Sequence, residues 1–407
     1  MSFLFDSSRT QKTFFTLKKL RIIVGGFIGL YPTGGVTWDY IQYVLGLQLL
    51  GHDVYYIEDT NQYARFQKSG KAWDDASDSI DYLRKTMESF GLKHKWAYRD
   101  VASSACYGLS LSQLKKICFS ADIFINISAS TILRDEYLSI PCRILIDSDP
   151  MFTQIDYFND LKNRDTDRHK MKFVVENHTH LFSFGENIGK EDCKIPAFDF
   201  TWIPTRQPIC INYWPVQQTQ MDNAVFTSVM NWSVKKACLY DKQEWGQKNV
   251  EFEKFISIPE LFPEASFKVM ITGISSEKEA EIKNAGWQLS NPLQHVTNAA
   301  AYQSFINSSD AEFSVAKETY VKSNSGWFSC RSACYLAAGK PVITQDTQWS
   351  KYIPSGNGLF AFTDILSAME ALHELKANTA KHAKAAREIA AAYFDSNKIL
   401  NELLLQL

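Results

Sequence analysis

The chain has 407 residues, of which 45% are hydrophobic and 22% charged, a composition typical of a globular protein with two or three domains. Its formal net charge of −2 argues against an extended nucleic-acid footprint, and its eight cysteines show neither a C-x-x-C pair nor zinc-ligand spacing. The sequence has no apolar run long enough to span a membrane and no signal-peptide pattern. We therefore expect a cytoplasmic protein with reduced thiols.

The first part of the chain alternates short apolar strands with helices, which predicts an α/β domain. The clearest unit is a strand over residues 20–25, a glycine-rich loop over 25–35, a helix over 36–50 and a strand over 54–57. This order is the usual start of a doubly wound sheet. The later predicted elements are a helix over 80–90 and strands over 122–127, 143–146 and 181–184.

The glycine-rich loop is expected to let backbone approach a ligand, because Gly25, Gly26, Gly34 and Gly35 carry no side chain. The loop lacks a clean G-x-G-x-x-G pattern, and Glu58 lies too far along the chain for a dinucleotide fingerprint. Nicotinamide binding is therefore not predicted. The alternative for Gly34 and Gly35 is a simple turn before the helix.

A proline-rich segment over residues 195–216 interrupts the first series and suits a crossing between domains. A second α/β series follows, with strands over 224–229 and 267–272 and a helix over 249–255. The residues from 368 to the end are expected to be mostly helical.

The segment SGWFSCRSACYLAAGKPVITQD covers residues 325–346 and is the most informative in the chain. Ser329 and Ser332 lie where a helix should begin, Gly339 ends that helix, and a buried strand follows over residues 342–344. The amide groups and the positive end of a helix N-terminus favour an anion, so the segment predicts a site for a phosphate-bearing ligand. The alternative is that the two serines only cap the helix.

These features together resemble the GT-B class of glycosyltransferases over most of the chain. LGLQLLGHDVYYIED (residues 45–59) looks like the entry into the second strand of such enzymes, and SGWFSCRSACYLAAGKPVITQD resembles their donor-diphosphate helix and the strand after it. The motifs SFGENIG, IPTRQP, VMNW, AEFSVAK and SGWFSCRS resemble a bacterial-type group of these enzymes. The resemblance implies an α/β fold with two Rossmann-like domains that face each other across a cleft.

In this arrangement, residues 1–205 form an acceptor-side domain, residues 206–384 form a nucleotide-sugar donor domain, and a helix over 385–407 crosses back to the first domain. The resemblance implies transfer of a hexose or related sugar from a nucleotide sugar, such as a UDP-sugar, to an acceptor hydroxyl. The donor is a co-substrate, and neither a cofactor nor a metal is expected. Closure of the two halves would limit hydrolysis of the donor.

The departing diphosphate needs positive charge from side chains or a helix end when no metal supplies it. The alternatives are solvated lysines and, for Arg331, a structural salt bridge. The resemblance assigns the diphosphate to Ser329, Ser332, Lys248, Lys317 and Arg331. It assigns the donor sugar or nucleotide to Gln345, Asp346, Trp327 and Asn231.

The motifs favour an enzyme that inverts the configuration at the anomeric carbon of the sugar. The Glu-x7-Glu signature of retaining members is absent, because Cys334 and Gly326 stand at its two positions. The segment GWFS (residues 326–329) instead resembles the Gly-Trp-x-Ser of inverting enzymes, although the histidine that begins that pattern is missing.

An inverting transfer needs a base that takes the proton from the acceptor hydroxyl. The candidates are Asp149, Asp39 and Glu186, which follow strands or begin a helix in the first domain. Turn formation is the alternative for Asp149, and compensation of the helix dipole is the alternative for Asp39. His178 and His180 are expected to alternate on one strand, where a core histidine is the ordinary interpretation.

The pattern Asp147-Ser148-Asp149 has the form that binds metal in the other major glycosyltransferase fold, but it lies away from the diphosphate segment, so no metal site is predicted. Two other classes stay open, a sugar-nucleotide epimerase or hydrolase on the same fold and a non-catalytic nucleotide-sugar-binding module. The acceptor is open between a small molecule, a saccharide and, less favoured, a nucleic-acid base. The weak overall charge argues against a large nucleic-acid footprint.

Overall fold

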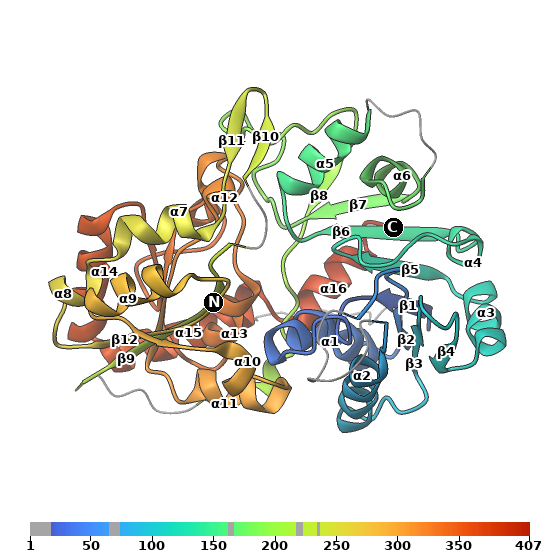
Figure 1. Cartoon of the computed structure of the whole chain (residues 1–407), viewed down its shortest axis with the longest axis horizontal. Coiled ribbons are helices and arrows are strands. Elements are labelled where there is room, and N and C mark those ends of the chain that lie inside the picture. The colour runs from blue at the N-terminus through green and yellow to red at the C-terminus, as the bar shows by residue number, and fades with distance from the viewer. Residues whose placement is uncertain (1–17, 65–73, 162–166, 217–222, 234–236) are drawn as a thin grey trace, which may run out of the picture.

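The computed structural model describes residues 18–64, 74–161, 167–216, 223–233 and 237–407. The described residues form two α/β units, each built on its own sheet, that lie side by side (Figure 1). None of the described helices is long and apolar enough to cross a lipid bilayer.

The first unit contains an eight-stranded sheet in the order β4-β3-β2-β1-β5-β6-β7-β8, and every pair except β3 with β4 is parallel. The order reverses between β1 and β5, which is where open α/β sheets leave a crevice at their carboxyl ends. The strands are β1 (Arg21–Gly25), β2 (Asp53–Glu58), β3 (Trp96–Arg99), β4 (Cys106–Gly108), β5 (Ile123–Ile127), β6 (Cys142–Asp147), β7 (His180–Ser183) and β8 (Trp202–Pro204).

Helices cover both faces of this sheet, which explains why its central strands are apolar almost throughout. In β1, Ile22 and Val24 pack in one core with α1 and α2, whereas Ile23 packs in another core with α3 and α4. The helices of this unit are α1 (Gly34–Leu49), α2 (Ser77–Ser89), α3 (Leu111–Phe119), α4 (Asp135–Leu138), α5 (Phe152–Leu161) and α6 (Met171–Glu176).

The expectation that His178 and His180 alternate on one strand is wrong. Helix α6 extends to Glu176, so His178 lies in the turn before β7 and only His180 belongs to the strand. The Nδ1 atom of His178 is 2.6 Å from the carbonyl oxygen of Val174, which makes this residue part of the helix end.

The second unit contains a six-stranded, fully parallel sheet in the order β13-β12-β9-β14-β15-β16, with a separate hairpin of β10 and β11. Its strands are β9 (Val225–Asn231), β10 (Cys238–Tyr240), β11 (Gln243–Trp245), β12 (Ser266–Thr272), β13 (Gln288–Ser290), β14 (Ala311–Ser314), β15 (Val342–Gln345) and β16 (Leu359–Phe362). Its helices are α7 (Lys248–Phe252), η2 (Glu253–Phe255), α8 (Ile258–Leu261), α9 (Ser276–Asn284), α10 (Pro292–His295), α11 (Ala299–Asn307), α12 (Glu318–Lys322), α13 (Cys330–Ala337), η3 (Trp349–Lys351) and α14 (Ile365–Ala377).

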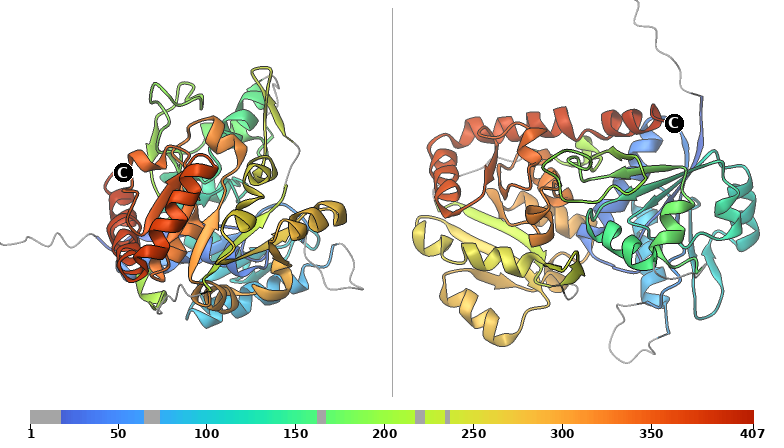
Figure 2. Two further views of the ribbon diagram at one scale, coloured as in Figure 1. Left: turned by 90° about the vertical axis from the view of Figure 1, so that its left-hand side faces the viewer. Right: turned by 90° about the horizontal axis from the view of Figure 1, so that it is seen from above.

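The end of the chain runs along both units as two helices (Figure 2). Helix α15 (Thr379–Tyr393) packs against α13 of the second unit, and α16 (Ser396–Leu404) packs against α1 of the first. The close contact between α1 and α16 requires Gly46, because a Cβ there would lie 2.5 Å from the Leu400 side chain. The crossing segment, which includes η1 (Ile211–Tyr213), meets the α15–α16 junction where the Ile209 amide bonds the Phe394 carbonyl at 2.7 Å.

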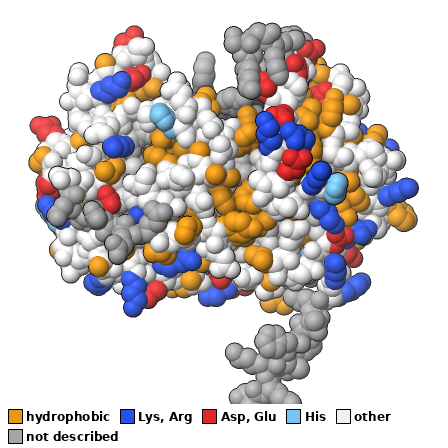
Figure 3. Space-filling view, turned by 90° about the horizontal axis from the view of Figure 1, so that it is seen from below, with side chains coloured by type: hydrophobic (Ala, Val, Ile, Leu, Met, Phe, Trp, Pro, Cys, Tyr) orange, Lys and Arg blue, Asp and Glu red, His pale blue; other side chains and the backbone are white. Residues whose placement is uncertain are grey.

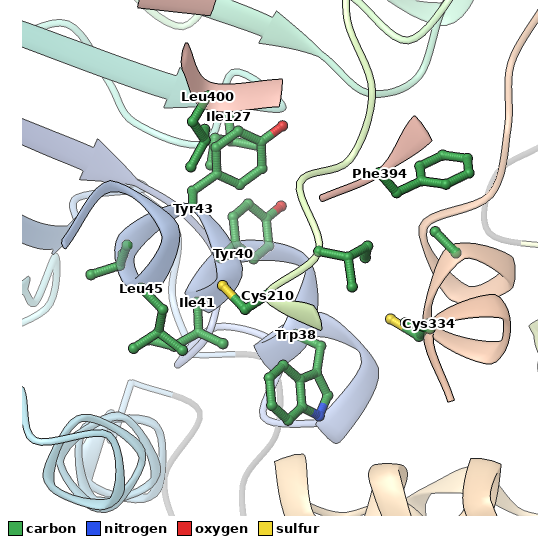
Figure 4. Packing of buried hydrophobic residues seen from close by; sticks show 14 of the residues in the cluster. Trp38, Tyr40, Ile41, Tyr43, Leu45, Ile127, Cys210, Cys334, Phe394 and Leu400 are labelled. Carbon is green, nitrogen blue, oxygen red and sulfur yellow. The ribbon is translucent and has the colours of Figure 1, made fainter. Parts of the chain in front are cut away.

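A continuous apolar core joins the two units around α1 (Figure 4). Trp38 packs against Trp214 of the crossing segment with ring centroids 4.9 Å apart, and its indole donates to the Ala299 carbonyl of the second unit at 2.9 Å. Buried Gln42 accepts hydrogen bonds from the Cys210 amide and the Trp214 indole. The contact between units is therefore closely packed.

Candidate functional site

Helix α13 begins at the interface, and its first-turn backbone amides lack hydrogen-bond partners in the described residues. Ser329 is the N-cap residue, yet its side chain makes no capping hydrogen bond. Within the described residues, the first-turn amides of Cys330, Arg331 and Ser332 have no acceptor, and the buried Ser332 hydroxyl has no partner either. Unsatisfied amides at a helix start favour an anionic ligand. The capping interpretation of Ser329 therefore does not account for its side chain.

Three cationic side chains of the second unit surround this helix start. Arg331 lies in its first turn, Lys248 is the first residue of α7, and Lys317 immediately precedes α12. Burial lowers the pKa of Lys248 well below its ordinary value, and repulsion from Arg331 and Lys317 adds to this effect. In the described parts of the chain, the Lys248 ammonium has neither a hydrogen bond nor an ion pair. Positive charge is thus concentrated here without full compensation.

Arg331 is fixed by two contacts within the second unit. Its Nε atom donates to the carboxylate of Glu312 on β14, and its second nitrogen donates to the Val229 carbonyl at 2.7 Å. Glu312 is completely buried, and one of its oxygens has no partner among the described residues. The guanidinium therefore has a set position, as a structural salt bridge requires.

Lys317 reaches across to the first unit. Its ammonium and the Tyr320 hydroxyl both bond the carboxylate of Asp149, which follows β6. Beside them, the Trp327 indole donates to the Ser148 carbonyl at 3.0 Å and its ring lies 4.4 Å from that of Tyr320. The two units therefore touch at this point through charged and aromatic groups.

Asp39 faces the same helix start from the second turn of α1. Because α1 begins at Gly34 and has no acidic residue in its first turn, compensation of the helix dipole does not explain Asp39. Burial raises its pKa to about 7, although nearby Arg331 lowers it and nearby Asp149 raises it further. The neighbouring Cys330 thiol also lowers this pKa, and it donates to the Gln207 side chain at 3.4 Å. Asp39 keeps partial access to solvent, so it is enclosed by both units without being sealed. A carboxylate with this pKa can accept a proton near neutral pH.

Glu186 is engaged differently from the other two candidate bases. It forms a two-pronged ion pair with Arg206 of the crossing segment, with N–O distances of 2.6 and 2.7 Å. Burial raises the pKa of Glu186, and Arg206 opposes that effect. The next residue, Asn187, bonds the second unit through its amide to the Ser325 carbonyl and through its side chain to the Asn324 carbonyl. Glu186 therefore lies in a structural contact between units.

The remaining donor candidates bond to residues of their own unit. Buried Gln345 accepts from the Ala316 amide at 3.2 Å and donates to Glu251 at 2.6 Å. Asp346 accepts from the Gln348 amide and the Ser350 hydroxyl of the following turn. Asn231 is exposed at the end of β9 and bonds Thr272. The contacts of these three side chains do not join them to the cations around α13.

The glycine-rich loop has no room for side chains at its predicted positions. A Cβ at Gly25 would lie 2.3 Å from the Thr131 hydroxyl, and one at Gly26 would lie 2.7 Å from the Tyr40 ring. At Gly34 it would meet the Asn298 carbonyl of the second unit at 2.2 Å, and at Gly35 the ring of Tyr302 at 3.3 Å. These glycines permit close packing, including packing between units.

Glu58 is a functional candidate that the sequence interpretation missed. Its buried carboxylate accepts from the amides of Gly29 and Leu30 and from the Tyr56 hydroxyl, and so anchors the loop between β1 and α1. Burial raises its pKa to about 7, and the two amides moderate the increase. The position of Glu58 at the end of β2, with a glycine-rich loop after the neighbouring strand, is the sequence signal that could have identified it.

The first acid of the Asp147-Ser148-Asp149 pattern is buried in the protein. Asp147 is buried and accepts from Thr153, Gln154 and Ser183, which occupies both oxygens. Within the described ranges, no group of three or more His, Cys, Asp or Glu side chains is placed to hold a metal ion.

The structure brings six of the predicted site residues together around the α13 start: Asp39, Asp149, Lys248, Lys317, Arg331 and Trp327.

No family model matches the chain, and no curated protein matches it by sequence. Solved structures match it over 95% of its length. An alpha-glucosyltransferase in complex with UDP and DNA containing an HMU base has a TM-score of 0.59 at 12% identity, with 98% of that chain covered. Sucrose-phosphate synthase from Thermosynechococcus elongatus (99% covered) and Anabaena HepE in complex with UDP and glucose (100% covered) each score 0.52 at 11% identity. The chain therefore has the GT-B fold, the two-domain α/β fold of these glycosyltransferases.

Proposed function

We propose that this protein is a glycosyltransferase that moves a sugar from a nucleotide-sugar donor to an acceptor hydroxyl, with inversion and without a metal. The observation that carries the proposal is one juxtaposition. The open amide end of α13 and the cations Lys248, Lys317 and Arg331 face Asp39 of the opposite unit. Solved structures of this fold that carry UDP support a nucleoside diphosphate as the leaving group.

The donor diphosphate is assigned to the second unit. The free amides of the first turn of α13, with the Ser329 hydroxyl, would accept the phosphate oxygens. Lys248 and Arg331 would neutralise the negative charge that grows as the leaving group departs. Bringing an anion to this place would also restore the protonated state of Lys248, which burial disfavours in the unliganded protein.

Asp39 is assigned as the base in preference to Asp149 and Glu186. The acceptor oxygen attacks the anomeric carbon, its proton passes to the Asp39 carboxylate, and the bond from that carbon to the diphosphate oxygen breaks. The electron pair of that bond leaves on the diphosphate. A pKa of about 7 lets Asp39 take the proton near neutral pH, whereas Asp149 and Glu186 already bond cationic partners.

The contact of Lys317 with Asp149 has to change during this reaction. Lys317 is bound to a carboxylate of the first unit in the unliganded protein, so a diphosphate competes with Asp149 for the same ammonium. Donor binding is therefore expected to separate the two side chains and to alter the contact between units.

Titration calorimetry with UDP, GDP and ADP, and then with the matching nucleotide sugars, tests the proposal. Binding of one nucleoside diphosphate is expected in the wild type and is expected to weaken in the double variant K248M/K317M. Absence of binding by every nucleotide and nucleotide sugar would contradict the proposal. Release of the diphosphate that is unchanged by any acceptor hydroxyl would instead indicate a nucleotide-sugar hydrolase.

A further inference from the structure

The amino ends of the parallel strands in the first unit form an edge that concentrates exposed lysines. Parallel strands place their starts at one edge of a sheet, and the helices that precede them end at that edge. The basic residues there are Lys18, Lys19 and Arg21 at β1, Lys93 and Lys95 at β3, and Lys115 and Lys116 on α3. The acidic residues of the same strand starts are Asp53 and Asp122, and Glu88 in the last turn of α2 pairs with Arg84 of its own helix.

Hydrogen bonds show that these segments are neighbours in space. Arg21 pairs with Asp53 at 2.8 Å and also donates to the Ser120 hydroxyl at the end of α3. Lys95 pairs with the same Asp53 carboxylate, and the Asp122 carboxylate accepts from the Arg21 amide at 2.7 Å. Both acids are thus already engaged by β1 and β3.

The remaining cations are not compensated. Within the described ranges, no ion pair involves Lys18, Lys19, Lys93, Lys115 or Lys116, and all five side chains are exposed. Lysines in the last turn of a helix also complement its dipole, which accounts for Lys116 on α3. That effect does not account for the lysines that precede β1 and β3.

Two large apolar side chains project from the same edge. Phe119, the last residue of α3, is 90% exposed, more than any other large hydrophobic residue in the described part of the chain, and Leu49 at the end of α1 is 58% exposed. His52 links the α1 end to the β1 start, because its ring nitrogen accepts from the Leu20 amide at 3.3 Å. Lys and Arg side chains lie beside hydrophobic ones at the right-hand margin of Figure 3.

We propose that this edge, defined by Lys18, Lys19, Lys93, Lys115, Lys116, Phe119 and Leu49, docks the protein on an anionic lipid surface. Lysines near a membrane surface are attracted by acidic headgroups, and an exposed aromatic or leucine side chain inserts among the acyl chains. Nucleic acid would use the same lysines, but it offers no apolar phase for Phe119. The apolar residues therefore favour lipid.

The position of the edge leaves the candidate site accessible. The carboxyl ends of the strands bear Asp149 and lead toward the second unit, so the amino ends lie at the opposite end of the sheet. Helix α3 lies on the side of the first unit that is turned away from the second (Figure 1). Docking would hold the protein on a membrane while the start of α13 stays away from the lipid surface, and it does not depend on sugar transfer.

Co-sedimentation of the full chain with vesicles tests this proposal. Binding is expected with vesicles of phosphatidylcholine and phosphatidylglycerol, absent with phosphatidylcholine alone, and weakened by salt. K115E/K116E is expected to weaken it about tenfold or more, and F119S to weaken it severalfold. The matched control K381E/K384E reverses two exposed lysines on α15 of the second unit and is expected to bind like the wild type.

Thermal unfolding and UDP titration of each variant check that the fold and the candidate site are intact. Equal loss in K381E/K384E would overturn the proposal, because net charge alone would then explain binding. Failure of the wild type to bind the acidic vesicles would also overturn it. So would binding of duplex DNA that depends on Lys115 and Lys116 while vesicle binding does not.

Discussion

The two sides of the interface differ in how their charges are compensated. On the second unit, the α13 amides have no acceptors and Lys248 has no ion-pair partner in the described residues. On the first unit, Asp149 and Glu186 are held by cations, whereas Asp39 has no ion pair within the described ranges. Function is expected where compensation is incomplete, because a bound ligand then supplies the missing charge.

Replacing Asp39 gives the sharpest test of this contrast. Asp39→Asn keeps the size of the side chain but removes its ability to take a proton, so turnover should fall about 10²- to 10⁴-fold. Diphosphate affinity should change little, because the cations lie on the opposite unit. Release of diphosphate and titration calorimetry measure the two effects separately. Loss of diphosphate binding together with turnover would place Asp39 in the donor site instead.

The same residue predicts a pH profile. Turnover at low substrate should rise with pH through about 7, because the base acts when deprotonated. Stability should change in the opposite direction. Asp39 and Glu58 have folded pKa values raised to about 7, so their contribution is complete below the unfolded values and is lost as pH rises through about 7. Thermal unfolding from pH 4 to 9 checks this, and E58Q should flatten the curve.

On the donor side, Lys248→Met should have effects of opposite sign on binding and on stability. Loss of a charged contact to a diphosphate is expected to weaken its binding about 10- to 100-fold. The protein without a ligand should become more stable, because the variant removes an amine whose protonated form is disfavoured by burial and by repulsion from Arg331 and Lys317. K254M is the control, since Lys254 is more than half exposed and pairs with Glu251. Unchanged affinity in K248M would remove Lys248 from the site.

Glu186→Gln should affect stability more than chemistry. The change leaves the half-buried Arg206 with a neutral partner, and we expect a loss of about 1–3 kcal/mol in the free energy of unfolding. Turnover at saturating substrate should remain within about threefold of wild type, since Asp39 is intact. Urea unfolding and diphosphate release measure these quantities. A large loss of turnover in a stable variant would return Glu186 to the list of bases.

Much of the fold was predictable because its signals are local. Apolar runs predicted the central strands, and Gly339 ends α13 with a φ of +71°, as a glycine after a helix commonly does. The order of motifs around Ser329 predicted the helix that faces the first unit. His178 was misplaced because a short helix, α6, has the same apolar content as a strand.

The roles of the acids could not be assigned from the sequence. Asp39, Asp149 and Glu186 were equivalent as residue types, and their environments depend on residues far away in the chain. Lys317 lies 168 residues from Asp149, and Arg206 reaches Glu186 only because the crossing segment passes beside it. Glu58 was set aside with the dinucleotide pattern, although it anchors the same loop. Tertiary contacts, which no local pattern contains, decide which carboxylate is left to react.

The smallest expected effect discriminates most directly between the two remaining bases. Asp149→Asn removes the carboxylate that binds Lys317 in the unliganded protein, so diphosphate affinity should rise about three- to tenfold. Turnover should persist, because Asp39 supplies the base. D192N is the matched control, since Asp192 pairs with Lys351 across the same two units away from α13. If D149N binds diphosphate more tightly and D192N does not, competition at Lys317 is the cause. If D149N instead loses turnover as strongly as we expect for D39N, Asp149 is the base that takes the proton. The ion pair of Asp149 with Lys317 would then have to break before the reaction.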